Sequence, residues 1–135
     1  MADYNKFYGF VEALAEKKHN LGADTIKVAL CNAANAPVAT DAVLADLVTV
    51  DTTNLDSVTL TVSSSSQTSG TYSLVLQDLT MTASAAVGPF RYIVLYNDTA
   101  TDDDLICWYD YGSEITLNAG DSLTLDFGAT VLTLA

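Results

Sequence analysis

The chain has 135 residues and a formal net charge of −12. This length predicts a single domain over residues 1–135 with a hydrophobic core of its own. An acidic surface repels phosphate groups, so no nucleic-acid partner is expected. No membrane partner is expected either, because no apolar run approaches the roughly 18 residues of a membrane-spanning helix.

The negative charge is concentrated in the C-terminal part of the chain. Residues 1–27 contain as many lysines as acids, whereas Arg91 is the only base in residues 28–135. The first ten residues, MADYNKFYGF, lack the basic and then apolar pattern of a secretory signal. We therefore expect a soluble protein that is made in the cytoplasm.

The first predicted element is an α-helix over about residues 3–21. Apolar side chains recur there at the spacing of one helical face. Asp3 is suited to be the N-cap, and Gly22 is suited to end the helix in a left-handed conformation. The apolar face consists of Phe7, Phe10, Val11, Leu14 and Leu21.

From about residue 24 to residue 135 the pattern predicts strands. Apolar residues alternate with polar ones, and turn residues separate the runs. One helical turn is expected at 41–47, and SSSSQTSG at 63–70 is expected to be a mobile loop. The expected strands are 25–30, 57–62, 72–77, 79–85, 90–96, 105–111, 114–118, 122–127 and 130–135.

The succession of strands without intervening helices indicates a mainly β fold. Strands with this spacing are typical of an antiparallel β-sandwich or a jelly-roll-like barrel. We expect the one N-terminal α-helix to pack on it.

Two of the expected strands are apolar on both faces, unlike a strand that is half open to water. One face of each strand carries four apolar or aromatic residues. The other face carries Ile93 and Leu95 in the first strand and Ile106 and Trp108 in the second. Either the N-terminal helix covers these strands, or their outer face contacts another protein.

The sequence carries no recognisable catalytic motif. Patterns of nucleophilic, metalloprotease and phosphate-binding sites are missing, and His19 is the only histidine. Glu114 with Asp110 or Asp126 is the one carboxylate pair to consider for glycoside hydrolysis, and solvated turns explain these acids more simply. We expect no enzymatic activity, no catalytic residues and no cofactor.

An acidic turn, DTATDDD, raises the question of a cation site. Carboxylates are preferred ligands of Ca²⁺, but this run lacks the glycine and the bidentate glutamate of an EF-hand loop. A solvated turn without metal is the expectation, and a weak cation site is the alternative. The acids concerned are Asp98, Asp102, Asp103 and Asp104.

Two cysteines lie far apart, each within a strand-like run. Cys31 and Cys107 form no CxxC pair, and free cysteine often behaves as a small buried hydrophobe. We expect both to be buried in this way, with a disulfide or a reactive thiol as the alternative.

An aromatic cluster near residue 110 has two interpretations. Trp108, Tyr109 and Tyr111 are residues of the kind that stack on sugar rings. Packing in a core or an interface explains them more simply.

Three lysines form the one basic patch of the chain. Lys6 and Lys17 flank the apolar face of the expected helix, and Lys18 lies near its end. They either extend around a docked helix or form a docking edge for an acidic partner.

Three segments resemble small virion proteins of tailed bacteriophages. They are FYGFVEALAEKKHNLGADTIKVALCN, PVATDAVLADL and VGPFRYIVLYNDTATDDDLICWYDYGSEITLNAGDSLTLDFGATVLTLA. The resemblance extends over most of the chain and includes no catalytic signature. It implies a capsid decoration (cement) protein, which stabilises a shell by binding its assembled state.

The resemblance further implies a homo-oligomer that binds the major capsid protein on the capsid surface of the virion. A tail, baseplate or fibre component that recognises glycans is the alternative, and an unrelated carbohydrate-binding module or enzyme is the third possibility. The expected partner surface comprises Lys6, Lys17, Lys18, Ile93, Leu95, Ile106 and Trp108.

Overall fold

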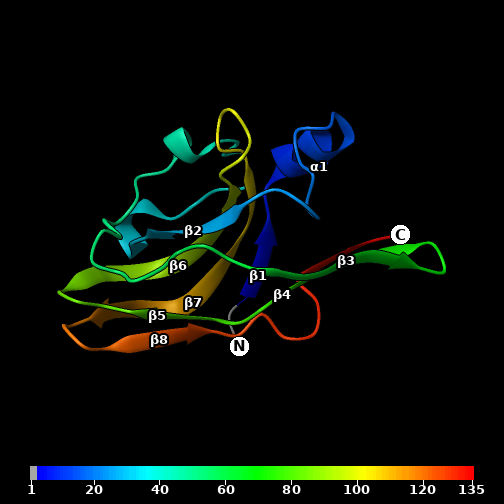
Figure 1. Ribbon diagram of the computed structural model, residues 1–135. Coiled ribbons are helices and arrows are strands. Elements are labelled where there is room, and N and C mark those ends of the chain that lie inside the picture. Colours follow the sequence, from blue (N-terminus) through cyan, green and yellow to red (C-terminus); the bar gives the residue numbers. More distant parts are fainter. Residues whose placement is uncertain (1–2) are drawn as a thin grey trace.

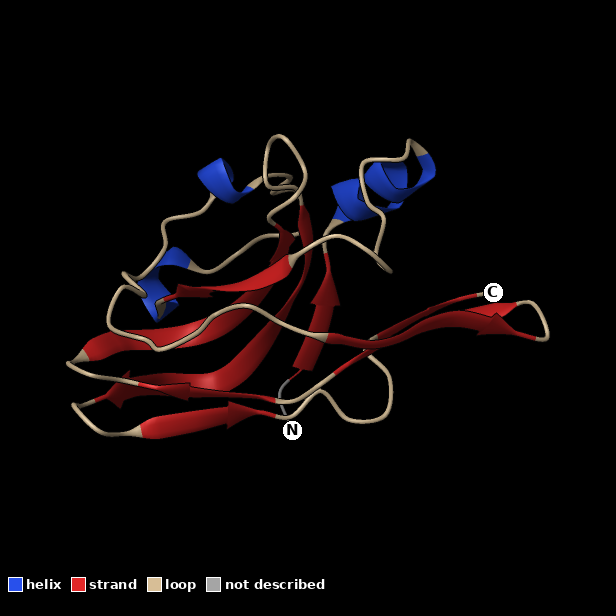
Figure 2. Ribbon diagram, viewed as in Figure 1, coloured by secondary structure: helices blue, strands red, loops and turns tan. Residues whose placement is uncertain are grey.

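A computed structural model describes residues 3–135 (Figure 1). The chain is mainly β with one α-helix near the N-terminus, and its antiparallel sheets pack together (Figure 2). The prediction of a mainly β, sandwich-like fold is confirmed. The barrel alternative is wrong, because the largest sheet is open and ends in two edge strands.

The largest sheet has the strand order β1-β7-β6-β2, and all its neighbours are antiparallel. The two central strands, β6 and β7, are longer than the predicted ones. β7 joins the runs expected at 105–111 and 114–118 into a single strand. The strands are β1 (Asp3–Lys6), β2 (Ile26–Cys31), β6 (Val87–Asn97) and β7 (Leu105–Leu117).

A two-stranded ribbon forms part of the second layer. It consists of β5 (Leu79–Thr82) and β8 (Ser122–Leu125), and it runs beside β7 in Figure 1. Met81 and Leu125 are buried in the same hydrophobic cluster as the side chains of β6 and β7. This shared core holds the two layers together.

The third sheet projects from the body as a long hairpin, and we call it the arm (Figure 1). Ser69 and Gly70 turn the hairpin with φ angles of 51° and 84°, as a two-residue turn with two left-handed residues requires. The mobile loop predicted at 63–70 is therefore wrong, since this segment is a strand and a tight turn. The arm consists of β3 (Val62–Thr68), β4 (Thr71–Leu76) and β9 (Leu132–Leu134).

The N-terminal helix is shorter than predicted and starts later. Asp3–Lys6 forms strand β1, which pairs with the stretch 107–110 of β7, and α1 covers only Tyr8–Ala15. Phe7 is the N-cap residue and makes no side-chain capping bond, so Asp3 is not the cap. Pairing with β7 provides hydrogen-bond partners for the backbone groups of β1. No local signal in the sequence of 3–6 indicates this pairing.

The helix ends near Lys17 and not at Gly22. Lys17 has a left-handed φ of 69°, and the Lys18 N–H donates to the Ala13 carbonyl over 2.9 Å. This Schellman arrangement satisfies the last carbonyls of the helix. Gly22 lies in the following loop, where a β-carbon would come within 3.0 Å of Ser65 Oγ on the arm.

Both faces of the central strands are covered by the chain itself. On one face Trp108 packs against Phe7 at the start of α1, with ring centroids 4.6 Å apart. On the opposite face Tyr109 packs against Phe127, which follows β8, with ring centroids 6.0 Å apart. The helix thus covers only part of one face.

Four side chains expected on the partner surface belong instead to the hydrophobic core. None of them is more than 9% exposed, so they leave no surface for a partner in this structure. This part of the expected partner surface is corrected. The four residues are Ile93, Leu95, Ile106 and Trp108.

The segment between β2 and β3 runs along the edge of β2. The Val28 N–H donates to the Val58 carbonyl over 2.8 Å, and the Leu60 N–H donates to the Ile26 carbonyl over 2.9 Å. These contacts make one antiparallel β-bridge, between Thr59 and Lys27, and no regular ladder. The strand predicted at 57–62 is therefore confirmed only at this bridge and at its last residue, where β3 begins.

Two short 3-10 helices interrupt this segment, η1 (Ala33–Asn35) and η2 (Leu44–Asp46). The helical turn predicted at 41–47 is confirmed by η2. Among residues 3–135, no helix combines the length and the hydrophobicity needed to cross a bilayer.

Both cysteines are free and buried, as predicted. Burial raises the pKa of the Cys31 thiol to about 11 and also raises that of Cys107. Both thiols therefore stay protonated at neutral pH and pack as small hydrophobic side chains.

Candidate functional site

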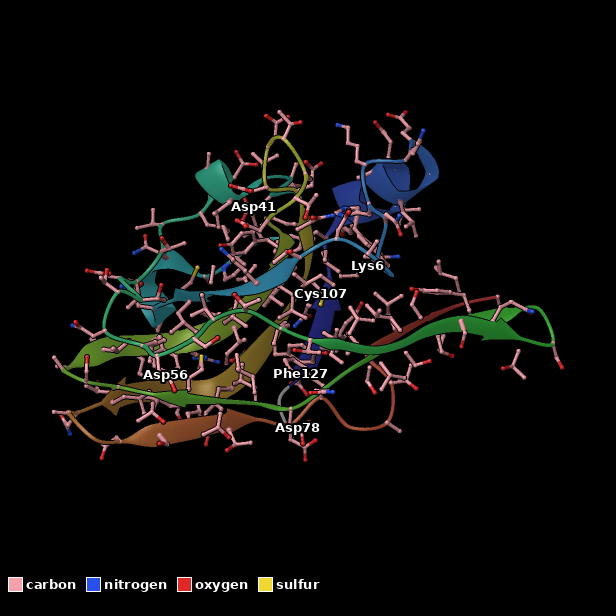
Figure 3. All side chains as sticks on the ribbon, in the orientation of Figure 1. Lys6, Asp41, Asp56, Asp78, Cys107 and Phe127 are labelled. Carbon is pink, nitrogen blue, oxygen red and sulfur yellow. The ribbon has the colours of Figure 1, made fainter. Side chains whose placement is uncertain are left out.

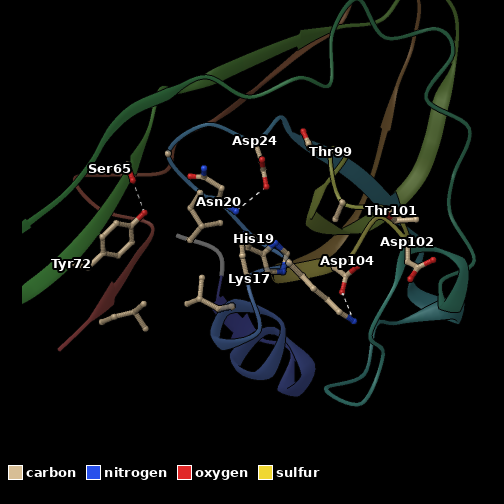
Figure 4. A pocket seen from close by; sticks show the side chains of 16 residues that line it. Lys17, His19, Asn20, Asp24, Ser65, Tyr72, Thr99, Thr101, Asp102 and Asp104 are labelled. Carbon is tan, nitrogen blue, oxygen red and sulfur yellow. Dashed lines mark hydrogen bonds and ion pairs between the residues drawn. The ribbon is translucent and has the colours of Figure 1, made fainter.

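An open groove of about 1070 Å³ lies between the end of α1, the acidic turn after β6 and one face of the arm (Figure 4). It collects most of the polar side chains of the loop that follows α1. The residues that frame it include Lys17, Lys18, His19, Asp24, Ser65, Tyr72, Asp102 and Asp104.

Asn97 is buried at the end of β6 and holds two residues that line this groove. Its Oδ1 accepts hydrogen bonds from the Thr99 and Ala100 amides over 2.9 and 3.1 Å. Its Nδ2 therefore points the other way, toward Asp24 Oδ2 at 2.8 Å and His19 Nδ1 at 3.0 Å. The orientation of the amide is fixed by four partners.

This arrangement selects one tautomer of His19. Because Asn97 Nδ2 is a donor, His19 Nδ1 is the acceptor and the ring proton of the neutral form resides on Nε2. Burial lowers the pKa of His19, against the opposing influence of Asp104 and Asp24. Among residues 3–135, Nε2 finds no hydrogen-bond partner, although the side chain is only 6% exposed.

The rim of the groove carries two of the three predicted lysines. Lys18 Nζ lies 4.0 Å from Asp104 Oδ2, which is buried, and Lys17 is exposed. Lys6 is exposed at the end of β1 and does not line the groove. Positive and negative groups alternate here, so the rim has no single sign of charge.

The four acids of the predicted turn are not gathered around one point. Asp98 pairs with Lys27 over 3.1 Å, and Asp104 is buried near Lys18. Within the described part of the chain, no group of three or more His, Cys, Asp or Glu side chains is placed to hold a metal ion. The turn offers hydrogen-bond and ion-pair partners to its own neighbours.

The carboxylates considered for glycoside hydrolysis each have a structural partner. Arg91 donates two hydrogen bonds to Asp110, at 2.8 and 3.1 Å, which lowers the pKa of Asp110. Glu114 accepts a bond from the Ala33 amide over 3.2 Å. Asp126 accepts one from the next turn. Each of the three carboxylates thus has a partner within the fold: an arginine, the backbone of a distant segment or the backbone of its own turn.

The outer face of α1 is the second notable surface. Tyr8 is 67% exposed and Val11 is 53% exposed, so Val11 is not part of the buried helical face as predicted. Lys6 precedes them (Figure 3) and Lys17 follows the helix (Figure 4). Both lysines are exposed. Within residues 3–135 neither lysine is in an ion pair. We call these four residues the α1 surface.

A third surface is an aromatic groove of about 680 Å³ on the face of β7 that carries Tyr109, opposite the face that carries Trp108. Tyr4 and Tyr109 meet edge to face with centroids 5.6 Å apart, and Tyr111 is exposed beside them. The predicted aromatic cluster is thus divided, because neighbouring residues of a strand point to opposite faces. Trp108 faces the core, while Tyr109 and Tyr111 line the groove together with Phe127.

Several residues of these surfaces were not identified in the sequence. Tyr4 was assigned to a helix, and Phe127 was assigned to a strand end without a role. Asn97 gave one signal, as a polar residue that closes a long apolar run. Its role depends on partners distant in sequence, such as His19, and the sequence alone does not show them.

Comparison with protein-family models, with curated proteins and with solved structures finds no match to this chain. Three surfaces of the molecule are suited to bind a partner: the α1 surface, the aromatic groove and the projecting arm.

Proposed function

We propose that the protein is a non-enzymatic structural component of a tailed-bacteriophage virion that decorates and stabilises the capsid shell. It binds the major capsid protein on the outer surface of the particle. Such a protein needs no reaction chemistry, because it stabilises the shell by adding binding free energy to the assembled state.

The observation that carries this proposal is the α1 surface. It presents two exposed apolar side chains, Tyr8 and Val11, on a protein whose net charge is −12. Exposed lysines precede and follow them in the chain, at Lys6 and Lys17. An apolar centre with a charged rim is the usual anatomy of a protein interface. The acidic remainder of the molecule favours a position outside the shell, away from packaged DNA.

The first test is the copy number of the protein in purified virions, measured against the major capsid protein. We expect a ratio near one or a simple fraction of it. A handful of copies per particle would overturn shell decoration in favour of a tail position. Absence from the particle would overturn the virion assignment altogether.

The second test measures binding to capsids that lack the protein. Lys6→Gln with Lys17→Gln should weaken binding about tenfold, since each rim charge contributes on the order of 0.5–1 kcal/mol. The matched control is Ala85→Glu with Ala119→Glu, which changes the net charge equally on exposed turns outside α1. Equal binding of both variants would contradict the role of the α1 surface.

A glycan-binding component of the tail or fibre is the second candidate, favoured by the aromatic groove. Tyr4, Tyr109 and Tyr111 offer ring faces and hydroxyls of the kind that bind sugars. In a titration with oligosaccharides followed by NMR, Tyr111→Ala should abolish binding and Tyr8→Ala should not. The absence of any shift in the unmodified protein would eliminate this candidate.

A further inference from the structure

The arm leaves two strand edges open. In the order β3-β4-β9, both β3 and β9 lie at an edge, and six of the seven residues of β3 are exposed. Proteins commonly protect such edges with lysines, prolines or inward-pointing charges. The sequence of β3, VSSSSQT, contains none of these. An edge of this kind is open to pairing with another strand.

The strands of the arm also carry no charged side chain, although the molecule is strongly charged. No acidic or basic residue occurs in 57–77 or in 127–135, although the chain has 17 acids. The uncharged stretches begin and end at acids, since Asp56 and Asp78 bracket the first and Asp126 precedes the second. Figure 3 places Asp56 and Asp78 in the body, outside the projecting part.

The inner face of the arm is fixed by the chain itself. Leu74 is buried, Ser65 Oγ and Tyr72 Oη lie 2.8 Å apart, and the Phe127 amide donates to Asp78 over 3.1 Å at the base. Ser64 and Ser66 lie on the other face, with their hydroxyls 3.4 Å apart and exposed. The arm therefore presents an outer face and an edge that no other part of residues 3–135 covers.

We infer that the arm is the contact surface between two copies of this chain, which pair through their β3 edges. A second copy is the occupant that the charges select. Two chains of net charge −12 repel one another wherever acids meet, and the arm is the surface on which they approach without opposing like charges. An edge strand is also self-complementary, because two antiparallel copies related by a two-fold axis exchange the same hydrogen bonds.

This inference goes beyond capsid binding and does not depend on it. The α1 surface would contact the shell, and the arm would link neighbouring copies of the decorating protein. An acidic partner is less suited to the arm than a second copy, because the arm offers no base.

The test is the molar mass in solution, measured by light scattering and sedimentation over a range of concentrations. The unmodified protein should associate, and association should become tighter as salt is added, since salt screens the repulsion between the bodies. Ser64→Glu with Ser66→Glu should weaken association by at least about a hundredfold, because like charges opposed across an interface are strongly unfavourable. Ala85→Glu with Ala119→Glu adds the same charge at distant turns and should associate like the unmodified protein.

A second measurement keeps the inference testable if the serine variant fails to fold. Amide hydrogen exchange of the unmodified protein should slow in β3 as the concentration rises, with no matching change in β1 or β2. A monomer at every concentration, or association that survives the two glutamates in a folded variant, would overturn the inference. A monomer that still binds capsids would overturn this inference and leave the proposed function intact. An oligomer linked through the arm but absent from virions would support this inference and overturn the proposed function.

Discussion

At the scale of single residues, His19 is the group whose chemistry is most strongly set by its surroundings. Asn97 donates a hydrogen bond to its Nδ1, and the ring of Phe10 packs against it with centroids 5.3 Å apart. The acids nearby are Asp24 and Asp104. Lys18 adds a like charge to any protonated form. Burial outweighs the two carboxylates, so the folded protein holds this imidazole neutral.

This leads to a prediction for the pH dependence of stability. The pKa of His19 is lower in the folded state than in the unfolded state, where it is about 6.5. As the pH falls through that value, the unfolded chain takes up a proton first and the free energy of unfolding decreases. His19→Gln should therefore lose less stability than the unmodified protein on acidification.

The measurement is the free energy of unfolding in urea, from about pH 8 to about pH 5, for both proteins. The carboxylates contribute equally to the two curves, so only the difference between the curves reports on His19. Parallel curves would show that the ring is not held neutral by burial.

At the scale of elements, Phe7 anchors the start of α1 to the sandwich, and Phe10 and Ala13 are the buried residues of the helix itself. Phe7 is fully buried against Trp108, whereas the adjacent Tyr8 is largely exposed. Phe7→Ala should lower the free energy of unfolding by about 3–5 kcal/mol, because a large side chain is removed from a packed core. The matched substitution Tyr8→Ala should change it by less than about 0.5 kcal/mol.

Thermal and urea unfolding of the two variants would check this prediction. A small effect of Phe7→Ala would contradict the prediction. It would mean that the contact between Phe7 and Trp108 contributes little to stability, and that Phe10 and Ala13 hold the helix in place.

The elements that could be predicted from the sequence are those whose signal is local. The apolar runs at 90–96 and 72–77 identify β6 and β4, because alternating and β-branched residues are typical of strands. The sequence of β3 predicts a loop, because serine has a low strand propensity and the pairing with β4 decides its structure. The pattern at 3–6 predicts a helix, because the strand that pairs with it, β7, lies far away in the chain.

The residues of the candidate surfaces also differ in whether a local signal or a distant contact decides their place. Lys17 was expected on a docking surface, and the structure leaves it exposed beside α1. Trp108 was expected there too, but its apolar character fitted both a core and an interface, and only the packing of Phe7 separates the two. Tyr4 was missed because its place in the aromatic groove depends on β1 being a strand.

At the scale of the whole molecule, charge is the dominant property. Seventeen acids and five bases give a net charge of −12, and three ion pairs are formed within residues 3–135. The remaining acids repel one another over distances comparable to the molecule when salt is low. The folded state brings them closer than the unfolded state does, so this repulsion opposes folding.

We therefore expect salt to stabilise the fold. Raising sodium chloride from about 10 to about 150 mM shortens the screening length from about 30 to about 8 Å, and the unfolding temperature should rise. A neutral osmolyte at equal osmolality is the control and should have a smaller effect. A fall in the unfolding temperature would mean that the attractive ion pairs outweigh the repulsion.

The order β1-β7-β6-β2 also has a consequence for the time course of folding. The hairpin of β6 and β7 is the one pairing in this sheet between strands that follow each other in the chain. Both outer strands come from the first 31 residues and must find partners beyond residue 91. Closing such large loops is slow, and folds of this kind typically reach their final state in milliseconds to seconds. We therefore expect the hairpin of β6 and β7 to form first during folding, and the N-terminal strands β1 and β2 to join the sheet last.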